Sequence, residues 1–194
     1  MSNPTSTKDK ILEFTSIVLQ ERGYNGFSYS HISKQLGIRN AAIHYHFPTK
    51  ADLGVAMIQC YQSQFGSWLA YNELQYTHQY EKLFEAYIAI SRSFIKKQNA
   101  ICPLAVLEAN YSVFPENMQK LTQILSKDIR SWFTQILTAG RKTSVFKFDG
   151  SPENKSILIL AALHGASMMV NGEFVDIFET TVTQIKLELG LIDE

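Results

Sequence analysis

The chain lacks the features that mark several classes of protein. Its 194 residues contain only two cysteines, Cys60 and Cys102, which lie far apart and in no CxxC arrangement. They suggest neither a disulfide framework nor a zinc site. The N-terminus has no apolar signal core, and the longest apolar run, residues 157–170, is shorter than the roughly 20 residues that cross a bilayer. We therefore expect a soluble, cytoplasmic protein with no membrane segment.

Strict two-residue alternation of polar and apolar residues is nearly absent, so strands are not expected. Apolar residues instead recur every three or four positions, as at Ile11, Phe14 and Val18, which is the period of an amphipathic helix. The five prolines fall where such segments begin or end. We predict an all-α fold with about nine helices, over residues 7–22, 28–35, 40–47, 50–75, 79–97, 102–113, 116–140, 153–171 and 174–189.

Catalytic and cofactor motifs are also missing. The chain has no HExxH, no P-loop and no ExxH pair of the kind that builds a di-metal site in a helical bundle. The nearest approach to a G-x-S-x-G motif, around Ser167, has no second glycine. We therefore expect neither an enzyme nor a bound metal or cofactor.

Formal net charge is zero, but the charge is unevenly distributed. Residues 1–50 carry six basic and three acidic side chains, whereas the remainder carries 12 basic and 15 acidic ones. A basic N-terminal part on an acidic body is consistent with a nucleic-acid partner, although the difference is small. We predict two domains, a DNA-binding head over residues 1–50 and a helical body over residues 51–194.

Residues 28–50, SYSHISKQLGIRNAAIHYHFPTK, form the most informative stretch. Two short amphipathic segments flank Gly37, which tolerates the positive φ of a tight turn. Ile32 and Leu36 supply the inner face of the first segment, and Ile38 and Ile43 supply that of the second. This is a helix-turn-helix pattern, whose second helix is short enough to enter the major groove of DNA.

The sequence resembles the TetR family of bacterial transcription regulators from Lys8 through Leu53. The resemblance rests on a first helix ending in ERGYNGFS, then HISKQLGI, then a short helix ending in HYHFPTKADL. It departs from the family pattern at Arg39, where a Ser is usual, and at His44, where a Tyr is usual. The resemblance implies a DNA-binding head, a ligand-binding and dimerisation body, and the fourth helix as the link between them.

The resemblance assigns DNA contacts residue by residue. Hydroxyl and ammonium groups suit phosphate oxygens, and these are predicted at Ser28, Tyr29, Tyr45 and Lys50. Side chains that can touch base edges are predicted at Arg39, Asn40, Ala41 and His44. Two alternatives stay open: Asn40 can serve as the N-cap of its helix, and the whole pattern can belong to an ordinary three-helix bundle.

The body is rich in aromatic residues, and an aromatic stripe at helical spacing is usually core. The resemblance implies a pocket among them for a small, largely apolar molecule. The candidate lining residues are Tyr61, Phe65, Trp68, Tyr87, Cys102, Trp132, His164 and Met168. Cys102 directly precedes Pro103 near a helix N-terminus, where a thiol can become reactive. A small buried hydrophobe is the alternative reading of this cysteine.

The segment SILILAALHGASMMV is apolar on nearly all sides, so it needs cover from a second subunit. A symmetric dimer would set two recognition helices about one DNA turn, ~34 Å, apart on a palindromic operator in double-stranded DNA. We therefore expect a homodimeric repressor, released from its operator by an unidentified small-molecule or thiol-reactive signal. The alternative is an activator or a protein-binding adaptor with the same fold.

Overall fold

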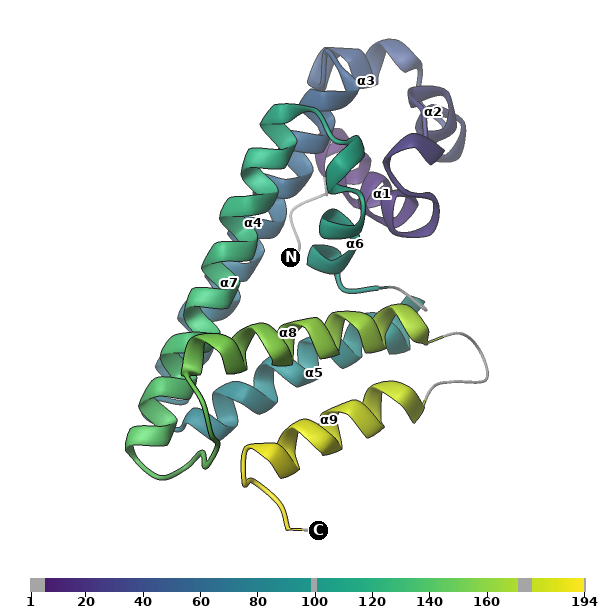
Figure 1. The fold of residues 1–194 in the computed structure, drawn as a ribbon. Helices are drawn as coiled ribbons and strands as arrows, with labels where there is room; N and C mark the ends of the chain where they lie inside the picture. Colours follow the sequence, from purple (N-terminus) through teal and green to yellow (C-terminus); the bar gives the residue numbers. More distant parts are fainter. Residues whose placement is uncertain (1–5, 99–100, 171–175, 194) are drawn as a thin grey trace. The chain divides into compact units, whose positions relative to one another are not determined.

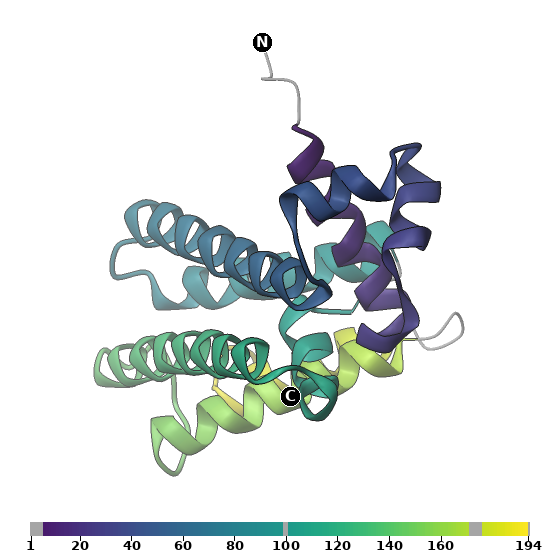
Figure 2. The same ribbon diagram turned by 90° about the horizontal axis from the view of Figure 1, so that it is seen from above.

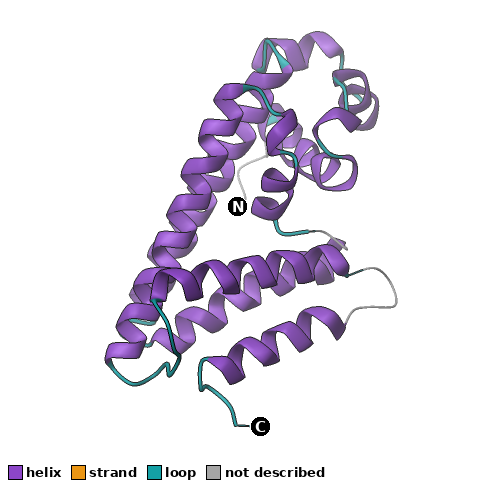
Figure 3. Cartoon of the chain, in the orientation of Figure 1, coloured by secondary structure: helices purple, strands orange, loops and turns teal. Residues whose placement is uncertain are grey.

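The computed structural model describes residues 6–98, 101–170 and 176–193, and within these ranges the chain is helical and has no strand (Figures 1 and 3). It contains nine α-helices and two short 3-10 helices there: α1 Thr7–Arg22, η1 Tyr24–Gly26, α2 Tyr29–Leu36, α3 Asn40–His46, α4 Lys50–Gln75, α5 Tyr80–Gln98, α6 Pro103–Ala109, η2 Tyr111–Val113, α7 Glu116–Lys142, α8 Pro152–Met169 and α9 Asp176–Glu188. The all-α prediction is confirmed. The predicted end at 171 and start at 174 lie outside the described residues.

Local capping explains where three of these helices start. Ser6 and Asp9 form a reciprocal capping box at α1. Thr49 Oγ1 accepts from the Asp52 N–H at 3.1 Å, and the Asp52 carboxylate accepts from the Thr49 N–H at 2.9 Å. At α8, the Ser151 hydroxyl accepts from the Asn154 N–H, and a proline occupies the first turn. These side chains satisfy backbone donors that the first helical turn leaves unpaired.

One predicted helix is wrong. Residues 102–113 do not form a single helix, because α6 ends at Ala109 and η2 follows. Asn110 leaves the helical conformation, and its Nδ2 donates to the carbonyl of Val106 at 3.0 Å. Pro115 then forces the residue before it into an extended backbone, and Phe114 has ψ 145°. The helix therefore ends at Ala109, although the helical sequence pattern continues to residue 113.

The chain divides into two compact units. The first comprises residues 1–65 and 106–124, and the second comprises residues 66–105 and 125–194. The chain passes from one unit to the other within α4, α6 and α7. The first unit thus contains the whole predicted head together with part of α4 and residues 106–124. The boundary predicted after residue 50 stays a prediction.

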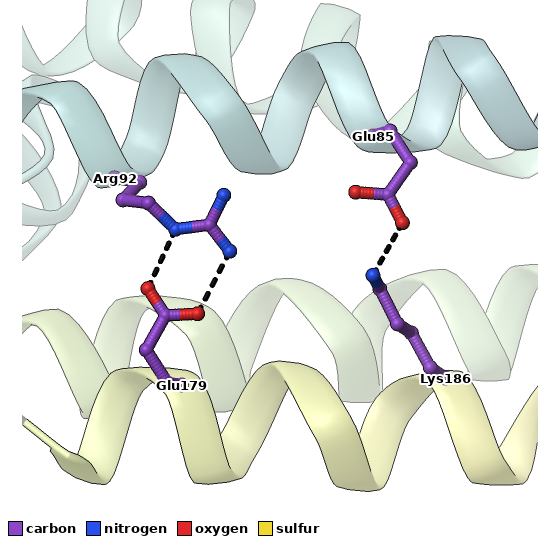
Figure 4. Close-up of polar contacts among 4 residues, drawn as sticks. All are labelled: Glu85, Arg92, Glu179 and Lys186. Atoms are coloured by element: carbon purple, nitrogen blue, oxygen red, sulfur yellow. Dashed lines mark hydrogen bonds and ion pairs between the residues drawn. The ribbon is translucent and has the colours of Figure 1, made fainter. Parts of the chain in front are cut away.

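In the second unit, α9 lies beside α8 and is joined to α5 by two ion pairs. Arg92 donates to both carboxylate oxygens of Glu179, at 2.5 and 2.7 Å, and Lys186 Nζ lies 2.5 Å from Glu85 Oε1 (Figure 4). The cation lies on α5 in one pair and on α9 in the other. This alternation favours the observed register of the two helices, since a shift that moved one cation opposite the other would place like charges together.

An aromatic cluster forms the other feature of the second unit. The ring centroids of Trp68 and Trp132 lie 5.4 Å apart, and that of Tyr87 lies 5.8 Å from Trp132 and 4.7 Å from Phe133. Trp132 Nε1 donates to Glu73 Oε1 at 3.2 Å. The rings meet mostly edge to face, the arrangement that aromatic quadrupoles favour.

No helix in the described part of the chain is both long and apolar enough to span a membrane.

Candidate nucleic-acid interface

Helices α1, α2 and α3 form a small head in which each helix contacts both others (Figure 2). Its core contains Ile32 and Ile43, which the pattern placed on the inner faces, and the other fully or nearly fully buried apolar side chains there are Ile11, Val18, Leu19, Phe27 and Phe47. Leu36 and Ile38, which were predicted for the inner faces, are only half-buried, as is Leu12. Helices this short depend on one another for stability, so this core keeps the second and third in place.

The turn between α2 and α3 depends on Gly37. Its φ of 64° and ψ of 27° are left-handed, and its N–H donates to the carbonyl of Ser33. Glycine adopts this conformation without the steric cost that a Cβ would add. The turn therefore presents α3 to solvent, as the helix-turn-helix pattern predicts.

The predicted base-reading side chains share one exposed stretch. Arg39, Asn40, Ala41 and His44 are all exposed, as is Tyr45, which is 84% exposed although it is a large aromatic residue. Five exposed side chains on seven consecutive positions give α3 a surface that faces away from the head core. The structure thus brings these predicted DNA contacts together.

The proposed N-cap at Asn40 is wrong. The cap position of α3 is Arg39, with an extended backbone at φ −77° and ψ 146° and no side-chain capping bond. Asn40 is the first helical residue, so its amide is not used as the cap. Residues 39 and 40 therefore both carry side chains that can extend toward a partner.

Two predicted phosphate contacts lie at the start of α2. Ser28 is exposed and is the N-cap, but its hydroxyl lies 2.7 Å from Ser30 Oγ rather than on the helix backbone. Tyr29 donates its hydroxyl proton to the carbonyl of Phe47 at 2.8 Å. Burial, followed by the Asp52 charge, raises the pKa of Tyr29 to about 12, so the hydroxyl stays protonated. A phosphate contact by Tyr29, which stays a prediction, would require this bond to break.

Lys50 lies within the head rather than extending from it. Its ammonium donates to the carbonyl of Phe27 at 2.8 Å and lies 4.5 and 4.4 Å from the ring centroids of Tyr24 and Phe27. Burial lowers the pKa of this lysine. The ammonium is thus held by a carbonyl and two aromatic faces, and it joins the start of α4 to the segment before α2. Its phosphate contact stays a prediction.

Replacing Lys50 with methionine is expected to lower the free energy of unfolding by roughly 1–2 kcal/mol, because a charge-assisted hydrogen bond and two cation–π contacts are lost. Urea unfolding of the full chain measures this change, and Lys34→Met, at an exposed position on α2, is the matched control. Unchanged stability with weakened DNA binding would show instead that Lys50 acts mainly on phosphate.

Residues 106–124 contact the head at Tyr24, within the first unit. The N–H of Tyr24 donates to Asn110 Oδ1 at 3.1 Å, and its ring centroid lies 5.3 Å from that of Phe114. Gly54 of α4 approaches α7 so closely that a Cβ there would collide with Met118 Sδ. No local pattern marks these contacts, since residues 24 and 110 lie far apart in the chain.

The predicted ligand-lining residues do not form one group. Trp68, Tyr87 and Trp132 meet in the aromatic cluster of the second unit, whereas Tyr61 belongs to the first unit and its hydroxyl pairs with that of Ser16. Met168 is 39% exposed on α8. Phe65, Cys102 and His164 are half-buried. Their shared role in binding a ligand stays a prediction.

Metal binding has no support among the described residues, where no three His, Cys, Asp or Glu side chains cluster as a metal ion would require.

The left-handed turn and the exposed α3 define a helix-turn-helix protein. The family model "Bacterial regulatory proteins, tetR family" matches residues 11–57. The chain is similar to the negative transcriptional regulator IcaR of the biofilm operon icaADBC of Staphylococcus aureus, with 24% identity over 66% of this chain and 70% of the relative. Together, the match over the head, the relative and the shared fold support a TetR-family transcriptional regulator.

Solved structures agree over nearly the full length. A TetR-family regulator from Agrobacterium tumefaciens is 28% identical, with a TM-score of 0.86 over 96% of this chain and 100% of the other. A TetR regulator from Legionella pneumophila is 24% identical, with a TM-score of 0.80 over 95% of this chain and 100% of the other. At this lower identity, the similarity to the Legionella pneumophila structure is evidence for a shared fold and not for a shared function.

Proposed function

We propose that the protein is a homodimeric repressor that binds a palindromic operator through α3 and leaves it when a small-molecule or thiol-reactive signal acts on the body. The observation that carries the proposal is the exposed stretch from Arg39 to Tyr45, held on a packed three-helix head. Arginine, asparagine and histidine can pair with base edges in the major groove. The relative IcaR is named a negative regulator, which favours repression. Binding to DNA implies action in the cytoplasm.

The apolar face of α8 supports the dimer. Ile157, Leu158 and Met169 are about half exposed, and a groove of about 300 Å³ runs between α8 and α9. A Cβ built on Gly165 would meet no atom, so another helix can approach closely there. An exposed apolar patch of this kind marks an interaction surface. In our proposal a second copy of the chain covers this apolar surface, and α8 and α9 form the interface.

The contacts of Tyr24 with Asn110 and Phe114 offer a route for the signal. Residues 106–124 share a compact unit with the head, so their displacement would move the head with them. The effector must bind the released conformation more tightly than the DNA-bound one, by about 1.4 kcal/mol for each tenfold loss of occupancy. Cys102 is half-buried directly before α6, and its modification is the thiol-reactive form of the signal.

An activator or a protein-binding adaptor with the same fold is the second candidate. It is favoured by a zero net charge and by the placement of Lys50, whose ammonium is used within the head. An adaptor would enrich no duplex at low salt. Binding to DNA that weakens steeply as salt is raised would exclude it, because neutralising phosphates releases counterions.

Substitutions at Arg39, Asn40 and Tyr45 distinguish contacts to bases from contacts to phosphate. Tyr45→Ala is expected to weaken binding to all duplexes alike, because a phosphate contact carries no sequence information. Arg39→Ala and Asn40→Ala are expected to change which bases are preferred, with roughly 1–3 kcal/mol of discrimination lost at one position each. Selection from a random duplex pool measures both effects. Equal loss on every sequence for all three variants would contradict this assignment.

A further inference from the structure

One ring nitrogen of His44 is already engaged within the head. His44 Nδ1 lies 3.2 Å from the carbonyl oxygen of Pro48. A carbonyl oxygen has no proton to give, so Nδ1 carries the hydrogen and donates it. In the neutral imidazole the other nitrogen, Nε2, is then an acceptor. The turn after α3 thereby sets the tautomer of the exposed histidine.

The ring is also held in orientation by a second contact. The centroid of the Tyr29 ring lies 4.7 Å from that of His44, at an interplanar angle of 64°. Tyr29 is itself fixed, because its hydroxyl donates to the carbonyl of Phe47. His44 nevertheless remains exposed, one helical turn after Asn40 on the same side of α3. An oriented side chain gives up little conformational freedom when it binds.

An acceptor on this exposed side chain matches only some groups on DNA. Phosphate oxygens, guanine O6 and N7, and thymine O4 are acceptors as well, so they offer it no proton. In the major groove the donors are the exocyclic amino groups, N6 of adenine and N4 of cytosine. We infer that His44 selects adenine or cytosine at one position of each operator half-site, by accepting a hydrogen bond from that amino group through Nε2. The inference rests on the proposed DNA-binding function and assigns a base-reading role to the side chain held by Pro48 and Tyr29.

Base analogues test this inference with the full-length protein and the duplex that it enriches. Purine in place of adenine, or 2-pyrimidinone in place of cytosine, removes only the amino group. At one position of each half-site we expect a loss of affinity of about 5- to 10-fold, the effect of one hydrogen bond. With His44→Phe, the same analogue should cause no further loss. The same analogue placed outside both half-sites is the control.

A second variant keeps the test independent of how well the first one folds. His44→Gln retains an acceptor oxygen and should keep a preference for adenine, which glutamine pairs through N6 and N7. An analogue effect of equal size in the wild type, His44→Phe and His44→Gln would overturn the role of His44 while leaving the proposed function intact. The same holds if no position responds to the analogues. Failure of the wild type to enrich any duplex would overturn both.

Discussion

Leu158→Glu is expected to convert the protein to a monomer and to lower its affinity for the operator more than 100-fold. Leu158 is 53% exposed on α8 and lines the groove between α8 and α9. In a dimer covered by that face, two copies of the glutamate would be buried without partners, which costs several kcal/mol. The monomer then binds through a single head, whereas two linked heads bind with an affinity roughly 10²–10⁴ times that of one head.

Sedimentation and titration of an operator duplex measure the two parts of this result. Leu74→Glu is the matched control, because Leu74 is 75% exposed on α4 in the same unit but lies outside the groove. The control should stay dimeric and bind normally. If Leu158→Glu remained a dimer with unchanged affinity, another surface would form the interface.

Trp132→Ala is expected to lower the free energy of unfolding by roughly 3–5 kcal/mol, the usual cost of removing a large buried aromatic side chain. Trp132 is only 3% exposed and packs on Trp68, Tyr87 and Phe133. Its Nε1 hydrogen bond to Glu73 would also be lost. Chemical unfolding of the full chain, followed by circular dichroism, measures the change.

The same variant separates two roles for the aromatic cluster. If Trp132 is a core residue, its loss weakens the second unit whatever the effector is. If it lines an open ligand pocket, stability should change by less than about 1 kcal/mol, since little packing would be lost. The second outcome would support the ligand-lining prediction for Trp68, Tyr87 and Trp132 together. Trp132→Phe, which keeps an aromatic ring, serves as the milder control.

Local sequence signals predicted much of this fold. The bounds of α1 and α4 agree with prediction because Ser6 with Asp9 and Thr49 with Asp52 are capping pairs within one turn. The turn at Gly37 was predictable for a similar reason, since one residue type tolerates its backbone conformation. Such features depend on residues three or four positions apart, which a sequence shows directly.

Contacts between distant segments were not predictable in the same way. Lys50 donates to the carbonyl of Phe27, and Tyr29 donates to that of Phe47. Both side chains were predicted to contact phosphate from their positions in the pattern. A backbone carbonyl exists at every residue, so no residue type marks the one that will accept a hydrogen bond. The exposed α3 surface was predictable, whereas the bonds that hold its neighbours required the structure.

The break at Asn110 illustrates the same limit. Residues 102–113 have a helical pattern, but Asn110 accepts from the N–H of Tyr24, 86 positions earlier in the chain. This tertiary contact lies where α6 ends, and the proline at 115 keeps residue 114 out of the helical conformation. The segment that appeared to be a plain helix is instead the part of the first unit that contacts the head.

The most direct test of the central claim is selection of duplexes from a random or genomic pool by the purified protein, with the mass of the complex determined in parallel. We predict a palindrome whose half-sites lie about one helical turn, ~34 Å, apart, bound by two copies of the chain. Binding should weaken steeply as salt is raised. Absence of any enriched duplex at low salt would contradict the claim that the Arg39 to Tyr45 surface reads DNA.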